Sequence, residues 1–349
     1  MVESDMAKID LKDSRIRYDG RIDKTNPNAP IFTWPGCLME FSFVGTAVKV
    51  NLNVTWCWGV RMLGAVIDGK ELSFDIEQGE NKVTLADGLE NTRHTVVIYK
   101  KMEGHYFVIN EILLDGELCE GNPLPKRRIE VYGDSVSAGS VVDCEDYVGK
   151  HDPENNNGKY DNALHAYPLL IARNMPAQVY VTSQGGISIF DRTGWFEWPN
   201  TTGMESCWDK ACYCTNVPQT EWDFSFKPHV IVFAIGQNDQ NPDPDCLSKP
   251  DYYKKWTDKY IEIVTNVKKH SPNAVVLFAL TVLMHPPIWD DALEDIKNRL
   301  GGEDKGFYHF MYSRCGKATP GHPRVSEQIE MANELTAFME KLPEDIWED

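Results

Sequence analysis

The sequence predicts an all-β sandwich followed by a doubly wound α/β domain. Three observations support this: period-two alternation of apolar residues in the first part of the chain, a Pro-bearing stretch at residues 121–125, and apolar runs interleaved with helical patterns after it. A length of 349 residues is long for one core and favours two domains. We therefore place the domains at residues 1–122 and 123–349.

The strands of the first domain are predicted from alternation. Residues 39–43 alternate apolar and polar side chains, Val44-Gly45-Thr46 predicts a turn, and residues 48–54 alternate again. The other signals are two turn dipeptides and two strand-like runs: Asp68-Gly69, Asp87-Gly88, residues 94–100 and residues 107–114. Short strands at regular spacing, with no helical period between them, favour an antiparallel sandwich.

The second domain shows strands that are apolar throughout. Residues 229–235 and 274–281 are continuous apolar runs, as in parallel strands buried on both faces. Between them, one apolar stripe predicts a helix: Trp256, Tyr260, Ile263, Val264 and Val267. The remaining expected elements are strands at residues 128–132, 179–182 and 306–312 and helices at residues 163–175 and 325–339. Such alternation of strand and helix predicts a doubly wound sheet.

Charge and hydropathy exclude several classes of partner. The chain has 53 acidic against 35 basic residues, a net charge of −18, which argues against nucleic acid and anionic membrane surfaces. No window approaches the eighteen apolar residues that a membrane span needs. The N-terminus has no basic region followed by an apolar core, so we expect a cytoplasmic protein, with a secreted form whose signal has been removed as the alternative. A neutral or cationic ligand suits this charge, and a homo-oligomer is left open.

Neither cysteines nor acidic residues form a standard metal motif. The nine cysteines are sparse, and the tightest group, Cys207, Cys212 and Cys214, matches no standard zinc spacing. We interpret them as reduced thiols. The acidic segment at residues 143–161 fits no calcium loop and is expected to be a solvated insertion. No metal and no cofactor are therefore expected.

Four short motifs follow the predicted strands of the second domain. They centre on Ser135, the pair Gly185-Gly186, Asn238 and His322. Ligands of open α/β sheets bind at the carboxyl ends of strands, so these residues are candidates for one site. A serine nucleophile, a histidine base and amide donors for an oxyanion are the parts of an acyl-transfer site. Each motif alone equally predicts an ordinary turn or cap, and only their joint order favours catalysis.

This set resembles the GDSL/SGNH hydrolase superfamily, whose four blocks centre on Ser, Gly, Asn and His. Gly133-Asp134-Ser135-Val136 and Gly236-Gln237-Asn238-Asp239 match the first and third blocks. With Gly20-Arg21 and Phe32-Thr33-Trp34-Pro35-Gly36 in the preceding β domain, the chain resembles the family 2 carbohydrate esterases over about residues 10 to 340.

The resemblance implies both fold and activity. The expected fold is a flavodoxin-like α/β SGNH-hydrolase domain, with helices on both faces of a parallel sheet, preceded by a jelly-roll or sandwich. The expected activity is removal of O-acetyl groups from plant-type oligosaccharides or polysaccharides (xylan, mannan or gluco-configured) through an acyl-enzyme. The alternatives are a lipase or thioesterase of the same superfamily, or a carbohydrate-binding protein without turnover.

The resemblance also implies residue roles. Ser135 is the expected nucleophile and His322 the expected base. The oxyanion donors are the Ser135 N–H, the Gly186 N–H (with Gly185 as the alternative) and the Asn238 amide.

Two tryptophans are candidates for stacking on a sugar ring. They are Trp195, shortly after the glycine pair, and Trp289, in the expected loop after the fourth strand. The competing interpretation is that both are packing residues.

The block around the histidine departs from the superfamily pattern. Most relatives carry an Asp two or three residues before the histidine, whereas this chain has Thr319-Pro320-Gly321-His322. We therefore expect a Ser–His dyad in which a backbone carbonyl replaces the carboxylate, as in some family 2 esterases, with Asp304 or Glu327 as alternatives. His285 and His309 are expected to be structural histidines.

Overall fold

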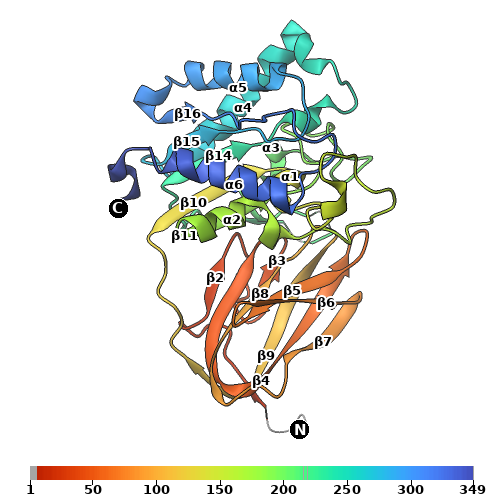
Figure 1. Cartoon of the computed structure of the whole chain (residues 1–349), viewed down its shortest axis with the longest axis vertical. Coiled ribbons are helices and arrows are strands. Elements are labelled where there is room, and N and C mark those ends of the chain that lie inside the picture. The colour runs from red at the N-terminus through yellow and green to blue at the C-terminus, as the bar shows by residue number, and fades with distance from the viewer. Residues whose placement is uncertain (1–5, 215, 218, 349) are drawn as a thin grey trace. The chain divides into compact units, whose positions relative to one another are not determined.

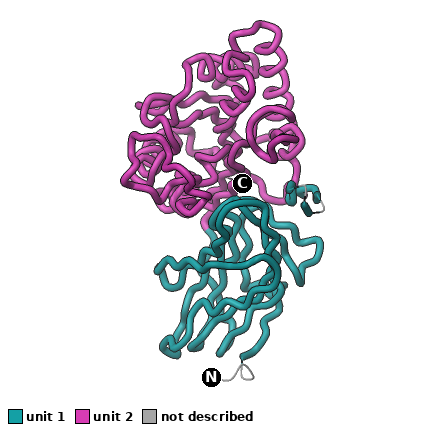
Figure 2. The backbone as a smooth tube through the Cα atoms, turned by 90° about the vertical axis from the view of Figure 1, so that its right-hand side faces the viewer, with its two compact units in different colours: residues 1–124, 211–222 teal, residues 125–210, 223–349 magenta. Residues whose placement is uncertain are grey.

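A computed structural model of the chain describes residues 6–214, 216–217 and 219–348 (Figure 1). Two compact units divide the chain (Figure 2): Met1–Leu124 with Ala211–Trp222, and Pro125–Lys210 with Asp223–Asp349. The division falls close to the expected boundary, but the assignment of Ala211–Trp222 to the first unit has no counterpart in the sequence pattern. Among the described residues, no helix is long and apolar enough to cross a membrane.

The first unit is built on a nine-stranded antiparallel sheet, which confirms the expected antiparallel β domain. Its main path runs β1-β9-β4-β8-β5-β6, while β2 and β7 pair with β4 and β3 pairs with β9. The strands are β1 Ala7–Lys8, β2 Arg17–Asp19, β3 Ile31–Phe32, β4 Leu38–Trp56, β5 Met62–Ile67, β6 Lys70–Asp75, β7 Gly79–Ala86, β8 Thr92–Tyr99 and β9 His105–Cys119.

The turn expected at Val44-Gly45-Thr46 is wrong, because β4 runs through it without a break. The pairing register of β4 with β9 shifts between Gly45 and Ala47, which marks a β-bulge. A Cβ on Gly45 would lie 1.9 Å from the carbonyl oxygen of Asp115, so the close approach of β9 requires glycine here. The bulge interrupts the alternation in the way that a turn would.

Side-chain contacts explain why residues 211–222 belong to the first unit. The ring of Tyr213 stacks on Trp34 with centroids 3.6 Å apart. The Thr33 hydroxyl donates to the carbonyl of Ala211 at 3.0 Å. These partners lie far apart in sequence, so no local pattern reveals them.

The second unit contains a five-stranded parallel sheet in the order β11-β10-β14-β15-β16. Counted from the start of the sheet this is the order 2-1-3-4-5, which confirms the expected parallel sheet and is the strand order of flavodoxin-like folds. The strands are β10 Arg127–Gly133, β11 Ala177–Ser183, β14 Val230–Ala234, β15 Val275–Phe278 and β16 Phe307–His309; β12 Lys210–Cys212 and β13 Thr220–Glu221 form a separate pair.

Helices α2 and α6 pack against each other, and so do α4 and α5 (Figure 1). The helices are α1 Ser135–Ala138, α2 Tyr167–Asn174, α3 Met204–Cys207, α4 Pro250–His270, α5 Ile288–Arg299 and α6 Val325–Met339. The predicted apolar stripe of α4 is buried, as expected. By contrast, α2 is shorter than its predicted range, and α5 occupies a segment that was expected to be a loop.

Strand β10 lies between β11 and β14. The chain passes from β10 to β11 on one side, and then from β11 back across β10 to β14 on the other side. This reversal is the topological switch point of the sheet, the place where ligands of open α/β sheets bind outside the carboxyl ends of the strands. The fold therefore brings the residues after β10, β11 and β14 to neighbouring positions.

Candidate active site

Ser135 is the first residue of α1, directly after the central strand β10. The Asp134 side chain caps this helix by accepting the Val136 N–H at 3.0 Å. The first N–H groups of a helix have no partner within the helix, so the Ser135 N–H can serve a bound anion. Gly133 is required because a Cβ there would lie 2.2 Å from the Ser137 hydroxyl oxygen.

Gly186 and Asn238 follow the two strands that flank β10. Gly186 has a φ of +73°, and a Cβ on it would lie 2.9 Å from the Cβ of Trp195. The Asn238 amide donates one hydrogen to the carbonyl of Ile187 at 2.9 Å, which fixes its direction. A primary amide has a second hydrogen to donate. The fold thus brings the loops of Ser135, Gly186 and Asn238 to three adjacent strand ends.

Asp239 ties the third loop to the second. Its carboxylate accepts the Ile189 N–H at 2.7 Å and the Thr193 hydroxyl at 2.9 Å. Desolvation raises the pKa of Asp239 to about 6, against the lowering effect of these hydrogen bonds. A buried acid with several donors holds the loop that carries Gly186 in one conformation.

His322 reaches this edge of the sheet on the segment at residues 310–324, which returns from β16 to α6. The Gly316 N–H donates to Thr281 at 3.0 Å and the Met284 N–H donates to Thr319 at 2.9 Å, so the segment follows the chain that leaves β15. At the start of α6, the Gln328 amide donates to the carbonyl of Val136 in α1 at 3.1 Å. This bond joins the beginning of α6 to the helix of Ser135.

Asp152 holds the His322 ring. The His322 Nδ1 lies 2.6 Å from Asp152 Oδ2, and the His322 backbone N–H donates to Asp152 Oδ1 at 2.9 Å. The fully buried Arg324 also donates to Asp152 Oδ1 at 2.9 Å and to the carbonyl of His322. Gly321 permits this approach, since a Cβ there would lie 2.6 Å from Asp152 Oδ1.

The electrostatics match a histidine that takes up a proton. Desolvation acts to lower the pKa of His322, but the hydrogen bond and charge of Asp152, with smaller contributions from Asp161 and Asp134, raise it above its ordinary value. Burial acts to raise the pKa of Asp152, and the hydrogen bonds from His322 and Arg324 lower it well below its usual range. Asp152 is therefore an anion that orients and stabilises the imidazolium.

The expected dyad is therefore wrong, because a carboxylate occupies the place that we assigned to a backbone carbonyl. Neither alternative acid fills it: Glu327 caps α6 by accepting the Arg324 N–H at 3.1 Å, and Asp304 lies in a short 3-10 turn at Glu303–Lys305. Asp152 comes from the acidic insertion at residues 143–161, which we took for a solvated loop. No spacing relative to His322 marks it, because the two residues are 170 positions apart.

The two candidate tryptophans differ in exposure. Trp289 is 1% exposed in α5 and packs edge-on against Trp256 at 5.5 Å, so its expected role in sugar binding is wrong. Trp195 is 47% exposed, and its N–H donates to the carbonyl of Gly186 at 2.8 Å. Trp195 thus keeps an open face beside the candidate oxyanion glycine.

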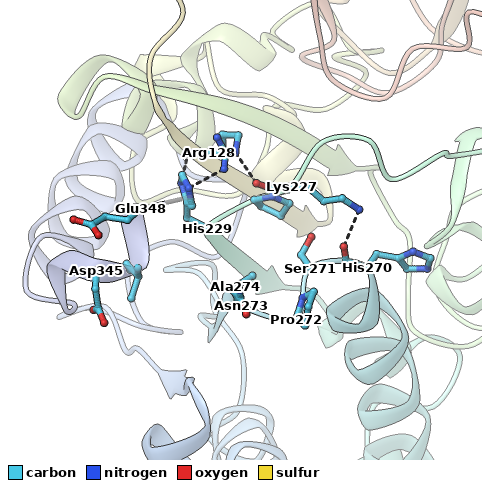
Figure 3. Close-up of a pocket in the computed structure, with 12 residues that line it drawn as sticks. Arg128, Lys227, His229, His270, Ser271, Pro272, Asn273, Ala274, Asp345 and Glu348 are labelled. Atoms are coloured by element: carbon cyan, nitrogen blue, oxygen red, sulfur yellow. Dashed lines mark hydrogen bonds between the residues drawn. The ribbon is translucent and has the colours of Figure 1, made fainter.

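A cavity of about 840 Å³ lies at the opposite, amino edge of the same sheet (Figure 3). Arg128, His229 and Ala274 line it where β10, β14 and β15 begin, and Asp345 and Glu348 line it from the C-terminal segment. The Arg128 guanidinium lies 2.8 Å from the His229 ring. None of the sequence-predicted catalytic residues lines this cavity.

The cysteines form no disulfide bond. All nine lie among the described residues, and none is bonded to another cysteine. Burial raises the pKa of Cys212 to about 12, and Cys207 is also buried. Of the two structural histidines, His309 lies 3.0 Å from Glu294, whereas His285 lies beside an acid and a thiol.

Comparison with known proteins gives matches to both units. Residues 18–120 match the family model described as Carbohydrate esterase 2 N-terminal. The chain is 25% identical over 339 residues to the Cellulase/esterase CelE of Acetivibrio thermocellus. The match covers 92% of this chain and 39% of that relative, so the chain spans less than half of the relative's length. It is 22% identical over 358 residues to the Acetylxylan esterase / glucomannan deacetylase of Cellvibrio japonicus, covering 96% of the chain and 90% of the relative.

Solved structures share the fold over almost the whole chain. A family two carbohydrate esterase from Cellvibrio japonicus superposes with a TM-score of 0.80 at 20% identity, covering 98% of both chains. A family two carbohydrate esterase from Clostridium thermocellum in complex with cellohexaose gives 0.76 at 23% identity, covering 93% of this chain and 98% of that one. Together these matches confirm the resemblance of the chain to the family 2 carbohydrate esterases.

Proposed function

We propose that this protein is a serine carboxylic ester hydrolase that removes O-acetyl groups from carbohydrates, with Ser135, His322 and Asp152 as its catalytic triad. The observation that carries the proposal is the His322–Asp152 pair just before α6, whose first turn is bonded to α1 through Gln328, with Gly186 and Asn238 after the strands that flank β10. The names of the relatives, a cellulase/esterase and an acetylxylan esterase / glucomannan deacetylase, support the same activity.

Acylation follows from this arrangement. Since Nδ1–H of His322 donates to Asp152, Nε2 carries the lone pair and takes the proton of the Ser135 hydroxyl as its oxygen attacks the acetyl carbonyl. The negative charge on the carbonyl oxygen is stabilised by the N–H groups of Ser135 and Gly186 and the Asn238 amide. Each such donor typically contributes about 3 kcal/mol to the transition state. The ester C–O bond then breaks, and the leaving sugar oxygen takes the proton from His322.

Deacylation repeats the same steps with water. His322 removes a proton from a water molecule that attacks the acetyl group on Ser135, and then returns the proton to the serine oxygen. The products are acetate and the free enzyme. A chain with a net charge of −18 weakly favours departure of the acetate anion.

The substrate class extends this proposal. An acetylated plant-type oligosaccharide is neutral and needs no electrostatic steering, and Trp195 offers an apolar ring on which a sugar can stack. The proposal includes a lack of nucleic-acid and membrane partners, an SGNH-type catalytic domain at residues 123–349 and a jelly-roll arrangement of the strands in residues 1–122. The resemblance and the charge of the chain support these assignments.

Acetate release tests the function. The purified chain is assayed on acetylated xylo-, manno- and gluco-oligosaccharides and on simple esters of increasing acyl length. We expect hydrolysis of acetyl sugars, a steep loss beyond acetyl, and a fall in turnover of at least about 10³-fold in Ser135→Ala and in His322→Ala. Activity that rises with acyl length would instead identify a lipase or thioesterase. Sugar affinity without turnover would identify a binding protein.

A further inference from the structure

A second cluster of titratable groups lies in the α/β unit, in contact with the segment that leads to His322. It joins His285 from the chain after β15, Asp290 from α5, and Cys315 from the segment at residues 310–324. The His285 Nε2 lies 3.2 Å from Asp290 Oδ2 and 4.0 Å from Cys315 Sγ, and Cys315 Sγ lies 3.5 Å from Asp290 Oδ1. Three side chains from three segments thus converge on one point.

The protonation of His285 is fixed by its other nitrogen. Nδ1 lies 2.7 Å from the carbonyl of Leu283, which can only accept, so Nδ1 carries a hydrogen. In the neutral ring, Nε2 then presents a lone pair to the Asp290 carboxylate and the Cys315 thiol. A backbone carbonyl on Nδ1 is the arrangement that commonly orients histidine ligands of metals.

Burial makes this arrangement costly without a cation. The side chains of His285 and Asp290 are only 1% and 8% exposed, and Cys315 is 6% exposed. A lone pair and a carboxylate that face each other in a dry site repel unless a proton or a metal lies between them. The cluster therefore needs a positive charge.

We propose that His285, Asp290 and Cys315 form a binding site for a zinc ion. A tetrahedral zinc with bonds of about 2.0 Å to nitrogen or oxygen and about 2.3 Å to sulfur separates its ligand atoms by roughly 3.3 to 3.5 Å. The His285 Nε2 has Asp290 Oδ2 at 3.2 Å and the Cys315 Sγ has Asp290 Oδ1 at 3.5 Å, so each has one carboxylate oxygen at about this spacing, and one ligand atom of each residue lies within 4.8 Å of the other two. The sulfur–nitrogen distance of 4.0 Å is about 0.5 Å longer than 3.5 Å, a gap that small side-chain rotations close.

Charge and ligand type select the metal. A thiolate and a carboxylate carry one negative charge each. Together they balance the two positive charges of a divalent ion, so the buried site has no net charge. Sulfur and imidazole favour zinc over magnesium or calcium, which take oxygen ligands. Zinc displaces the thiol proton of Cys315 into solvent when it binds the sulfur.

The fourth position has oxygen donors nearby. The carbonyl oxygens of Leu280 and Thr281 both lie 3.6 Å from Cys315 Sγ. The hydroxyl of Thr281, which is 1% exposed, has no hydrogen-bond partner among the described residues. A water or one of these oxygens can complete the tetrahedron. The ion would fasten the segment of His322 to β15 and α5, which is a structural role independent of the proposed esterase activity.

Metal content tests the proposal on the whole chain. The protein is incubated with excess Zn²⁺, dialysed against a weak chelator and analysed for zinc, and a Co²⁺-loaded sample is examined for a thiolate-to-cobalt charge-transfer band. We expect one zinc per chain and that band in the wild type. In Cys315→Ser and Asp290→Asn the retained zinc should fall by at least about tenfold relative to the wild type, and Cys315→Ser should lose the charge-transfer band. Cys37→Ala, which removes another buried thiol, should retain zinc like the wild type.

Two results would overturn the proposal. If the wild type retains no zinc, the cluster is a metal-free histidine–aspartate pair with a thiol. If Cys315→Ser and Asp290→Asn retain as much zinc as the wild type, the ion binds elsewhere. If both variants fail to fold, X-ray absorption at the zinc edge of the wild type tests the site. The proposal requires one sulfur ligand on zinc, and a spectrum without sulfur would refute it.

Discussion

Two histidines of the α/β unit each contact an aspartate, but through opposite ring nitrogens. In His322 the carboxylate of Asp152 binds Nδ1 at 2.6 Å. In His285 a backbone carbonyl binds Nδ1 at 2.7 Å, and the carboxylate of Asp290 faces Nε2 at 3.2 Å.

This difference assigns different chemistry to the two rings. A carboxylate on Nδ1 stabilises an imidazolium and leaves Nε2 to carry protons, which suits a general base. A neutral carbonyl on Nδ1, with an acid and a thiol at Nε2, suits a metal ligand. The position of the acid around the ring, more than its presence, distinguishes the two roles that we propose, a general base for His322 and a metal ligand for His285.

The largest expected effect comes from removing His322. His322→Ala should lower kcat for acetyl-ester hydrolysis by about 10³- to 10⁴-fold, because Ser135 loses its base. His285→Ala should instead lower zinc content and thermal stability. Steady-state kinetics with melting curves measure both, with His309→Ala, a histidine paired with Glu294, as the control that keeps activity. Equal losses of kcat in folded His322 and His285 variants would contradict the contrast.

The next largest effect comes from Asp152. Asp152→Asn keeps the shape of the side chain but removes the charge, so kcat/KM should fall by about 10²- to 10⁴-fold. Asp143→Asn is the matched control, because Asp143 also contacts a histidine Nδ1, that of His165, from the same insertion. A fall in kcat/KM of less than about threefold for Asp152→Asn would favour a Ser–His dyad over the triad.

A pH profile sharpens the same contrast. The base must be neutral, and the pKa of His322 is raised above 6.5, so kcat/KM should fall as the pH drops through a midpoint above 6.5. Asp152→Asn should move this midpoint to lower pH. For stability the sign is opposite: the protonated His322–Asp152 pair stabilises the fold below pH 6.5, and this contribution is lost as pH rises through the raised pKa. A midpoint that does not move in Asp152→Asn would show that another group titrates.

The smallest effect on activity is expected at the tryptophans. Trp195→Ala should raise KM for acetylated oligosaccharides several-fold and change the free energy of unfolding by less than about 0.5 kcal/mol, since the ring is half exposed. Trp289→Ala should leave a cavity in the core and cost about 3–5 kcal/mol of stability. Denaturant unfolding and kinetics on sugar and simple esters separate the two. An unchanged KM in Trp195→Ala would remove it from the site.

The sequence predicted the parallel sheet, because fully buried strands are continuous apolar runs. The ranges at residues 229–235 and 274–281 contain β14 and β15, and the helix predicted at residues 325–339 coincides with α6. The same local reasoning failed at Gly45, where a bulge breaks the alternation as a turn would, and at α5, whose residues follow a Pro pair and were assigned to a loop.

The part of the candidate site that follows directly after the strands was predictable from the order of elements along the chain. Ser135, Gly186 and Asn238 each follow a strand, so the topology of the sheet brings their loops together. The acid that contacts His322 was not predictable. Asp152 lies 170 positions away in the sequence, and only the tertiary fold brings the two side chains together. The cluster of His285, Asp290 and Cys315 was missed for the same reason, since its members share no short motif.

Covalent trapping of the nucleophile tests the central claim most directly. An alkyl fluorophosphonate is added to the wild type, His322→Ala and Asp152→Asn, and the labelled residue is identified by peptide mass spectrometry. We expect one label per chain, on Ser135, formed fast in the wild type, more slowly in Asp152→Asn and slowest in His322→Ala. A label on another residue, or full esterase activity after Ser135 is labelled, would contradict it.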